Sequence, residues 1–264
     1  MATPNETRGA RPSATQVLAR IFFIVVGLGA IGWGGFFLPI FWRQSPTHYV
    51  AVAYMQGRGF SDQVLLNQAQ RVAAAVDSPF CDPTELHDAV MLRLAILNNA
   101  IAAANPTLIT SGRDALNDTT RRAISCAPAD AFAWLTLFWL DASRKGITPD
   151  NANYLRMSYT TGPNEAWIGL WRNRLAIASL AQLPPDLSDD AIDEFIKLVD
   201  TERAYPEMAA SFAGATAVVQ GRIVDHLKNA SVTSRQVFAR VLYDRGLDVK
   251  IPDVGVPWLR PWER

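Results

Sequence analysis

The sequence predicts an all-α protein in which one N-terminal transmembrane helix is followed by an α-solenoid-like domain of helical hairpins. An uncharged run of 22 residues, Ile21 to Trp42, stands near the N-terminus. From Ser61 onward, apolar residues recur at helical spacing between turns that contain Pro or Gly. The chain has no convincing series of alternating segments that would predict a sheet, so the domain is expected to consist of packed helices.

The N-terminal run contains a literal G-x-G-x-x-G, formed by Gly27, Gly29 and Gly32. A dinucleotide-binding fingerprint also needs an amphipathic helix after the third glycine and an acidic residue about 20 positions later. The residues after Gly32 have no polar face, and no Asp or Glu occurs between Glu6 and Asp62. The glycines therefore do not indicate a nucleotide site.

Residues 20–43 are predicted to form a transmembrane helix. As a helix, the uncharged run would span about 33 Å, enough for a hydrocarbon core of about 30 Å. Gly27, Ala30 and Gly34 fall on one face of that helix and predict a smooth stripe for packing against another membrane helix. The alternative is that glycine is simply frequent in membrane helices.

An uncleaved anchor is favoured over a signal peptide, because the run exceeds the usual apolar core of about 7–15 residues. Arg8, Arg11 and Arg20 precede the helix, whereas Arg43 and Arg58 follow it closely. The positive-inside rule favours a cytoplasmic N-terminus and an exported domain. The chain has 21 Arg against only four Lys, which suggests a GC-rich bacterial genome. Together with the anchor and its orientation, this predicts a bacterial inner-membrane protein with a periplasmic domain.

Two segments flank the predicted membrane helix. Residues 1–19 lack apolar periodicity and are expected to be a disordered cytoplasmic tail. Residues 44–60 are expected to be a connector, in which the alternation over 48–54 fits a short strand or a helix equally well.

The periplasmic repeat domain is predicted over residues 61–248. Ser61 caps its first helix, which reaches residue 76, and Asp82-Pro83 opens a second that ends at Asn105-Pro106. Further helices are expected over residues 111–125, 128–146, 148–160, 164–183, 188–199, 206–229 and 233–245. The fourth helix contains ten nearly continuous apolar positions, too few to cross a bilayer, and is expected to be buried.

Residues 249–264 form a Pro- and Trp-rich tail. Pro257 and Pro261 prevent regular helix there, and Trp258 and Trp262 are predicted to dock, either in the chain's own groove or on a partner.

Helix entries repeat along the middle of the chain. Pro128 and Pro163 align at an offset of 35 residues, and that alignment also pairs Ala131 with Ala166 and Phe132 with Trp167. Over residues 80–185 this pattern resembles the tetratricopeptide repeat family, whose period is about 34 residues. Departures include Phe138, where the family favours a small residue, and the 45 residues between Pro83 and Pro128. The resemblance implies stacked helical hairpins, with a generic helical bundle as the alternative.

The two cysteines, Cys81 and Cys126, each stand two residues before one of these prolines. The repeat places both at the same edge of successive hairpins, and the periplasm is oxidising. A disulfide is therefore favoured over free thiols.

No catalytic, cofactor or metal site is predicted. The histidines His48, His87 and His226 are far apart in sequence, and no nucleotide, hydrolase or calcium motif occurs. Acidic pairs such as Asp189-Asp190 stand where helix starts favour negative charge, although carboxylates distant in sequence can still meet in a fold. Trp134, Trp139, Trp167 and Trp171 are expected to be core residues.

The sequence favours a protein that is not an enzyme and that works as a membrane-anchored scaffold or assembly subunit. Its 25 basic and 25 acidic side chains cancel, which argues against nucleic-acid binding. The expected partners are the lipid bilayer and other membrane or periplasmic subunits, and the resemblance suggests surface-polysaccharide synthesis or export. The alternatives are an accessory subunit of a respiratory or transport complex and an enzyme acting on an envelope glycan.

Overall fold

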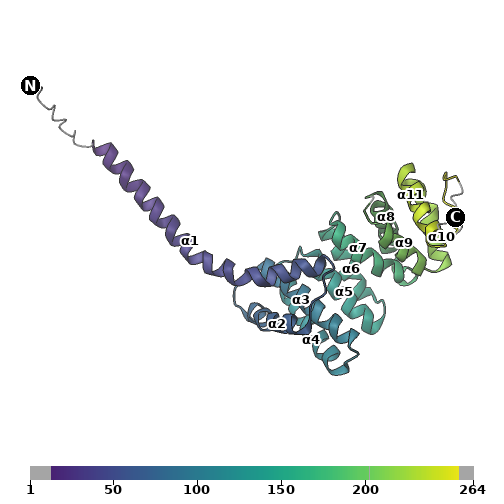
Figure 1. Cartoon of the computed structure of the whole chain (residues 1–264), viewed down its shortest axis with the longest axis horizontal. Helices are drawn as coiled ribbons and strands as arrows, with labels where there is room; N and C mark the ends of the chain where they lie inside the picture. The colour runs from purple at the N-terminus through teal and green to yellow at the C-terminus, as the bar shows by residue number, and fades with distance from the viewer. Residues whose placement is uncertain (1–12, 202, 256–264) are drawn as a thin grey trace, which may run out of the picture.

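The computed structural model describes residues 13–201 and 203–255, and every regular element in these ranges is helical. One long helix, α1 (Ala14–Met55), projects from a domain built of the remaining helices (Figure 1). These are α2 (Asp62–Asp77), α3 (Pro83–Ala102), α4 (Pro106–Cys126), α5 (Ala131–Lys145), α6 (Pro149–Thr161), α7 (Ala166–Ala178), α8 (Pro185–Asp200), α9 (Tyr205–Gly214), α10 (Ala217–His226) and α11 (Val232–Asp244). The all-α prediction is confirmed.

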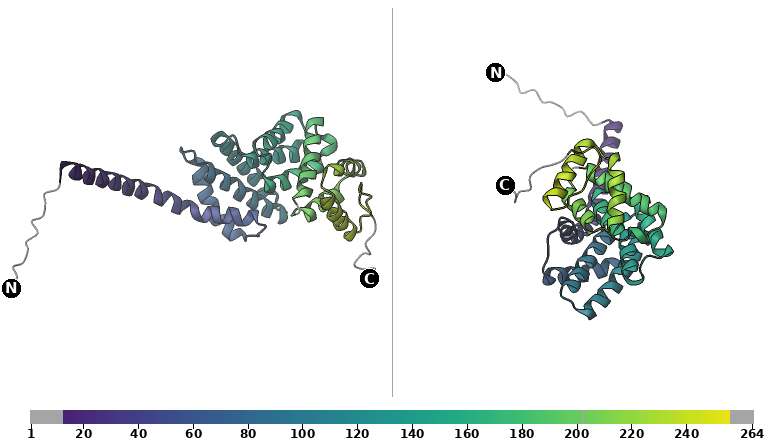
Figure 2. Two further views of the ribbon diagram at one scale, coloured as in Figure 1. Left: turned by 90° about the horizontal axis from the view of Figure 1, so that it is seen from above. Right: turned by 90° about the vertical axis from the view of Figure 1, so that its right-hand side faces the viewer.

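The domain is an elongated stack of helical hairpins. Helices α3 and α4, α5 and α6, and α7 and α8 pack as successive pairs, and each pair contacts the next (Figure 2). One continuous set of buried apolar side chains runs from Val50 in α1 to Ile251 near the C-terminus. This is the solenoid-like arrangement that the sequence predicts, since each hairpin buries its apolar face only against its neighbours.

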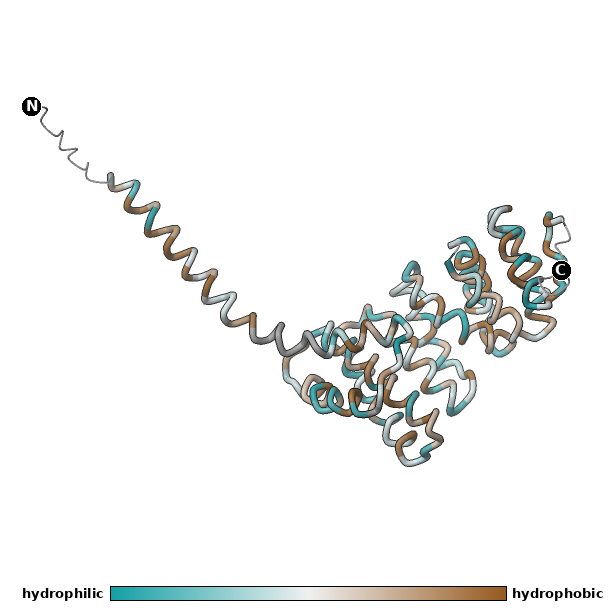
Figure 3. The backbone as a smooth tube through the Cα atoms, in the orientation of Figure 1, coloured by the Kyte–Doolittle hydropathy of each residue, from teal (hydrophilic) through white to brown (hydrophobic). Residues whose placement is uncertain are grey.

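The N-terminal helix is long and apolar enough to cross a membrane over Ala14–Leu38, and none of that segment is buried in the protein. Figure 3 shows apolar residues recurring along this segment from turn to turn. The Ser13 hydroxyl caps the helix by accepting a hydrogen bond from the Gln16 N–H. In turn, the Gln16 side-chain oxygen accepts one from the Ser13 N–H. The tail predicted over residues 1–19 is therefore helical from Ala14.

The predicted connector over residues 44–60 is wrong as a separate segment. The 42 residues of α1 run unbroken to Met55, and Val50, Ala51 and Ala53 are buried. His48 lies 2.9 Å from Asp88, and Asn98 donates a 2.6 Å hydrogen bond to the Tyr54 hydroxyl, so α1 runs parallel to α3. The local sequence allows residues 48–54 to form either a strand or a helix. They form a helix, and its buried face packs against α3.

Three helix boundaries also differ from the sequence prediction. The third domain helix begins at Pro106, because the Asn105 side chain accepts the Leu108 N–H. Ser188 lies inside α8, where its hydroxyl donates to the Leu180 and Leu183 carbonyls. The single helix predicted over 206–229 breaks after Gly214, and Thr216 caps a new one.

Two turns support the 35-residue offset directly. The turn from α4 to α5 begins at Ala127 (φ −131°, ψ 81°) and ends at Asp130 (φ −74°, ψ 97°). The turn from α6 to α7 has the same length, with Gly162 at φ −139°, ψ 60° and Glu165 at φ −84°, ψ 91°. The chain thus enters α5 and α7 through nearly the same backbone path.

The cysteines lie at disulfide-bonding distance. The Cα atoms of Cys81 and Cys126 are 5.5 Å apart and their sulfurs are joined. The bond links Cys81, two residues before α3, to the last residue of α4, so it closes the open end of this hairpin where the next one begins.

Candidate functional site: an aromatic groove between hairpins

Aromatic rings from three successive hairpins lie next to one another, tilted, in a row that we call the ladder. His87, Phe132 and Trp167 each lie four residues after the proline that opens α3, or that precedes α5 or α7. The ring centroids are 5.7 Å apart for His87 and Phe132, and 5.3 Å apart for Phe132 and Trp167. The three residues come from the first helices of three successive hairpins, α3, α5 and α7.

His87 also ties α3 to the start of α5. Its Nδ1 lies 2.8 Å from Asp130, whose other oxygen caps α5 by accepting the Phe132 and Ala133 N–H groups. Burial favours the neutral imidazole, but the hydrogen bond and charge of Asp130 outweigh it and raise the pKa of His87. Burial likewise opposes ionisation of Asp130, yet the same contacts lower its pKa. Both shifts favour the charged pair, so the contact stabilises the hairpin junction.

Beside the ladder, a groove of about 760 Å³ is bounded by α3, α5, α7 and α9. Its aromatic walls are Phe132, Trp139 and Trp171, with Leu135 and Leu170 between them. Polar groups lie at several points along it: Asn98, Thr136, Arg174, Glu207 and Ser211. A mainly apolar, aromatic groove with a few polar side chains is typical of a binding site.

The prediction that the tryptophans on the central helices are core residues holds only in part, because Trp139 and Trp167 pack against the core but none of the four is fully buried. Trp171 is 39% exposed, and Trp134, Trp139 and Trp167 are each only partly buried. Trp139 and Trp171 line the groove, whereas Trp134 stacks on Tyr154 and donates from Nε1 to the Pro128 carbonyl.

The repeat offers a signal that would have found the groove. Leu94, Trp139 and Arg174 each stand eleven residues after an equivalent proline, and all three line the groove. Aligning α3, α5 and α7 by their prolines shows that these three residues occupy the same position on their helices.

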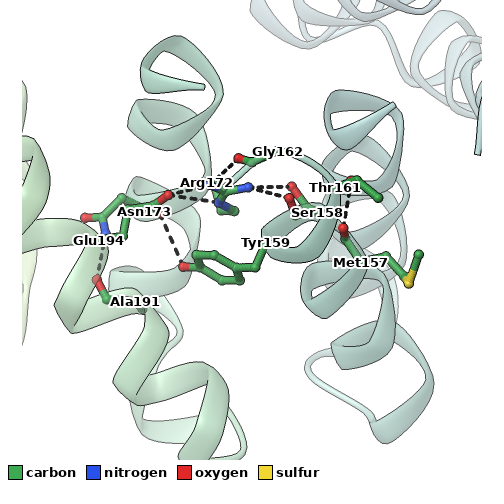
Figure 4. A network of polar contacts seen from close by, with 9 residues as sticks. All are labelled: Met157, Ser158, Tyr159, Thr161, Gly162, Arg172, Asn173, Ala191 and Glu194. Atoms are coloured by element: carbon green, nitrogen blue, oxygen red, sulfur yellow. Dashed lines mark hydrogen bonds and ion pairs between the residues drawn. The ribbon is translucent and has the colours of Figure 1, made fainter. Parts of the chain in front are cut away.

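A second polar cluster, absent from the sequence prediction, joins α6, α7 and α8 (Figure 4). Arg172 is completely buried, and its Nε and Nη2 donate to Glu194 Oε1 at 3.0 and 2.6 Å. Its Nη1 donates to the Ser158 carbonyl at 2.6 Å and its Nη2 to the Gly162 carbonyl at 3.1 Å. The guanidinium also lies 4.3 Å from the centroid of the Tyr159 ring.

This cluster is a structural clamp. Burial raises the pKa of Glu194, while the bonds from Arg172 oppose the change. The Tyr159 hydroxyl donates to Glu194 Oε2 at 3.3 Å, so both carboxylate oxygens are engaged. Gly169 permits the approach, because a Cβ there would lie 3.2 Å from Glu194 Oε1. A buried ion pair with its hydrogen bonds satisfied holds helices in register.

The other predicted site residues fall outside the groove. Gly27, Ala30 and Gly34 lie on the exposed apolar part of α1, and a Cβ at either glycine would meet no atom within 4 Å. Trp258 and Trp262 lie outside the described residues. The tail before them packs on the domain, since Ile251 is buried and Arg235 donates to the Pro252 carbonyl and to Asp253. No group of three or more potential metal ligands occurs in the described part of the chain.

Comparison with protein-family models, with curated proteins and with solved structures gives no match to this chain.

Proposed function

We propose that this protein is a membrane-anchored scaffold or assembly subunit whose groove binds a segment of a partner protein. The observation that carries the proposal is the aromatic groove, which crosses four helices of a domain attached to an exposed apolar helix. Extended concave surfaces of this kind are how stacked helical hairpins bind other proteins.

The anchor is supported by the continuity of α1. None of its apolar segment is buried in the structure, and such a surface is stable only when lipid or protein covers it. The same helix ends in the domain core at Val50, Ala51 and Ala53, so the span and the domain share one element. That continuity favours a permanent anchor over a removable signal sequence.

The disulfide and the arginine distribution support an exported domain. A disulfide persists in an oxidising compartment, and the arginines of the N-terminal tail favour a cytoplasmic N-terminus. We propose a bacterial inner-membrane protein with a periplasmic, tetratricopeptide-like domain. Its work in surface-polysaccharide synthesis or export is the narrower form of the proposal, and it rests on the family resemblance alone.

If the groove binds partner proteins, removing its aromatic side chains should weaken that binding. In the double variant Trp139→Ala/Trp171→Ala, we expect at least a tenfold reduction in the partners captured by crosslinked affinity purification from membranes, because buried aromatic anchors dominate interface energy. The variant Trp134→Ala is the control, since it removes a partly buried tryptophan ring that does not line the groove. Equal capture by the wild type and the double variant would overturn the proposal.

A second candidate is an accessory subunit held within the bilayer through α1. It is favoured by the glycines at 27 and 34, whose missing side chains serve no contact inside this chain. The triple variant Gly27→Leu/Ala30→Leu/Gly34→Leu is expected to abolish assembly with a partner helix while leaving the thermal unfolding of the domain unchanged. Leucines on the opposite face of the span, at Gly29 and Gly32, provide the control. If both variants assemble normally, the stripe faces lipid.

A further inference from the structure

The loop between α2 and α3 presents one apolar side chain to solvent in an unusual way. Phe80 is 81% exposed, the highest value among the large apolar side chains that the structure describes, including those on the apolar segment of α1. A single exposed apolar residue needs no explanation by itself. Two further features make Phe80 informative: the contacts that hold its loop, and the position of that loop relative to α1.

The loop is rigidly attached at several points. Cys81 is bonded to Cys126, and Arg122 Nη2 donates a 2.9 Å hydrogen bond to the Ser78 carbonyl. The Phe80 N–H donates to Ser78 Oγ at 3.2 Å. These contacts hold the backbone on both sides of Phe80. The segment that carries the exposed ring is therefore already ordered before it meets any partner.

The position of the loop follows from the parallel packing of α1 and α3. His48 is level with Asp88, and helices rise about 1.5 Å per residue. The first residue of α3, Pro83, is five positions before Asp88 and therefore lies level with roughly residue 43 of α1. That is where the uncharged run of α1 ends. Phe80 precedes Pro83, on the side that faces the apolar segment.

In a bilayer, this level is the headgroup layer. The headgroups occupy roughly 5–7 Å on each side of the hydrocarbon core, and aromatic side chains are favoured there. With the apolar segment of α1 across the membrane, the end of the domain nearest to it meets the lipid surface (Figure 1). We propose that Phe80 inserts into this layer as a second membrane contact, which sets the tilt of the domain on the bilayer.

The contact is apolar and not electrostatic. The charges at the loop are of both signs, since Asp77 is the last residue of α2 and Arg122 Nη2 is bonded to the Ser78 carbonyl. The partner is therefore the interfacial zone of the bilayer in general, and binding does not depend on anionic lipid. The proposal rests on the membrane anchoring proposed above.

The test places a photoreactive side chain at Phe80 in the full-length protein. The variant Phe80→p-benzoylphenylalanine is reconstituted into vesicles of phosphatidylethanolamine and phosphatidylglycerol, irradiated and analysed by mass spectrometry for lipid adducts. The same change at Val218, 77% exposed on α10 at the far end of the domain, is the control. We expect at least tenfold more lipid adduct at position 80, changing less than twofold when the phosphatidylglycerol is omitted.

Two results separate the possible failures. Release of the wild-type chain from membranes by alkaline carbonate would overturn the anchor and with it the proposed function. Retention of the chain with no lipid adduct at position 80, or with adducts to protein instead, would overturn the second contact alone. The variant Phe80→Ser should unfold at the wild-type temperature, because this side chain has almost no contact with the rest of the protein.

Discussion

Replacing Arg172 with methionine is expected to lower the free energy of unfolding by about 3–5 kcal/mol. The change leaves the Glu194 carboxylate buried without its partner, and breaking one side of a buried, hydrogen-bonded ion pair costs about this much. It also leaves the Ser158 and Gly162 carbonyls without their donor. Urea denaturation of the full-length protein in detergent, followed by circular dichroism, measures the effect.

The exposed pair formed by Arg156 and Asp186 gives the matched control. Its atoms approach as closely, at 2.6 Å, but both side chains are in contact with solvent. The variant Arg156→Met should therefore cost less than about 1 kcal/mol. The double variant Arg172→Met/Glu194→Leu should recover part of the loss, because it removes the unpaired charge together with its partner. A loss below about 1 kcal/mol for Arg172→Met alone would contradict the clamp.

Removing the disulfide is expected to cost a similar amount. The bond joins residues 45 positions apart, and the chain-entropy model gives about 4 kcal/mol for a loop of that length. The variant Cys81→Ser/Cys126→Ser should therefore unfold at lower urea concentration than the oxidised wild type. Wild type treated with reductant should unfold close to the variant, which separates loss of the bond from the effect of the serines.

Gel migration gives an independent check of the same bond. Oxidised wild type should migrate faster than the reduced protein on a denaturing gel, and its thiols should resist alkylation until reductant is added. Full alkylation of both cysteines in the denatured, unreduced protein would contradict the disulfide.

Several features follow from short stretches of sequence because local forces decide them. Asp82, Asn105, Asp130 and Thr148 each accept backbone N–H groups at a helix start, and Pro is in the first turn of α3, α4 and α6. A side chain that satisfies orphan N–H groups acts within three residues, so the start is readable without the fold. The uncharged run near the N-terminus is readable for a similar reason, since its length and composition are intrinsic.

The groove and the clamp are different in kind. Trp139 and Trp171 are large, mainly apolar residues of the kind expected in a core. Only the packing of α5 and α7 beside α9 leaves their rings lining an open groove. Arg172 is charged and would be expected at the surface, yet it is completely buried. It is accommodated there because Glu194 of α8, with Ser158 and Gly162 at the end of α6, accepts its hydrogen bonds. Neither outcome is decided by neighbours in sequence.

The helical class, the position of the apolar span and most helix starts follow from the amino-acid sequence, which also favours a disulfide between Cys81 and Cys126. Three features became visible only in the packed fold: α1 continues to Met55, the segment after Pro206 forms two helices, and Phe80 is exposed in the loop before α3. The physical reason is range: capping and hydrophobic periodicity act within one or two helical turns. Burial depends on contacts between residues that are 20 to 40 positions apart, such as His48 with Asp88 and Arg172 with Glu194.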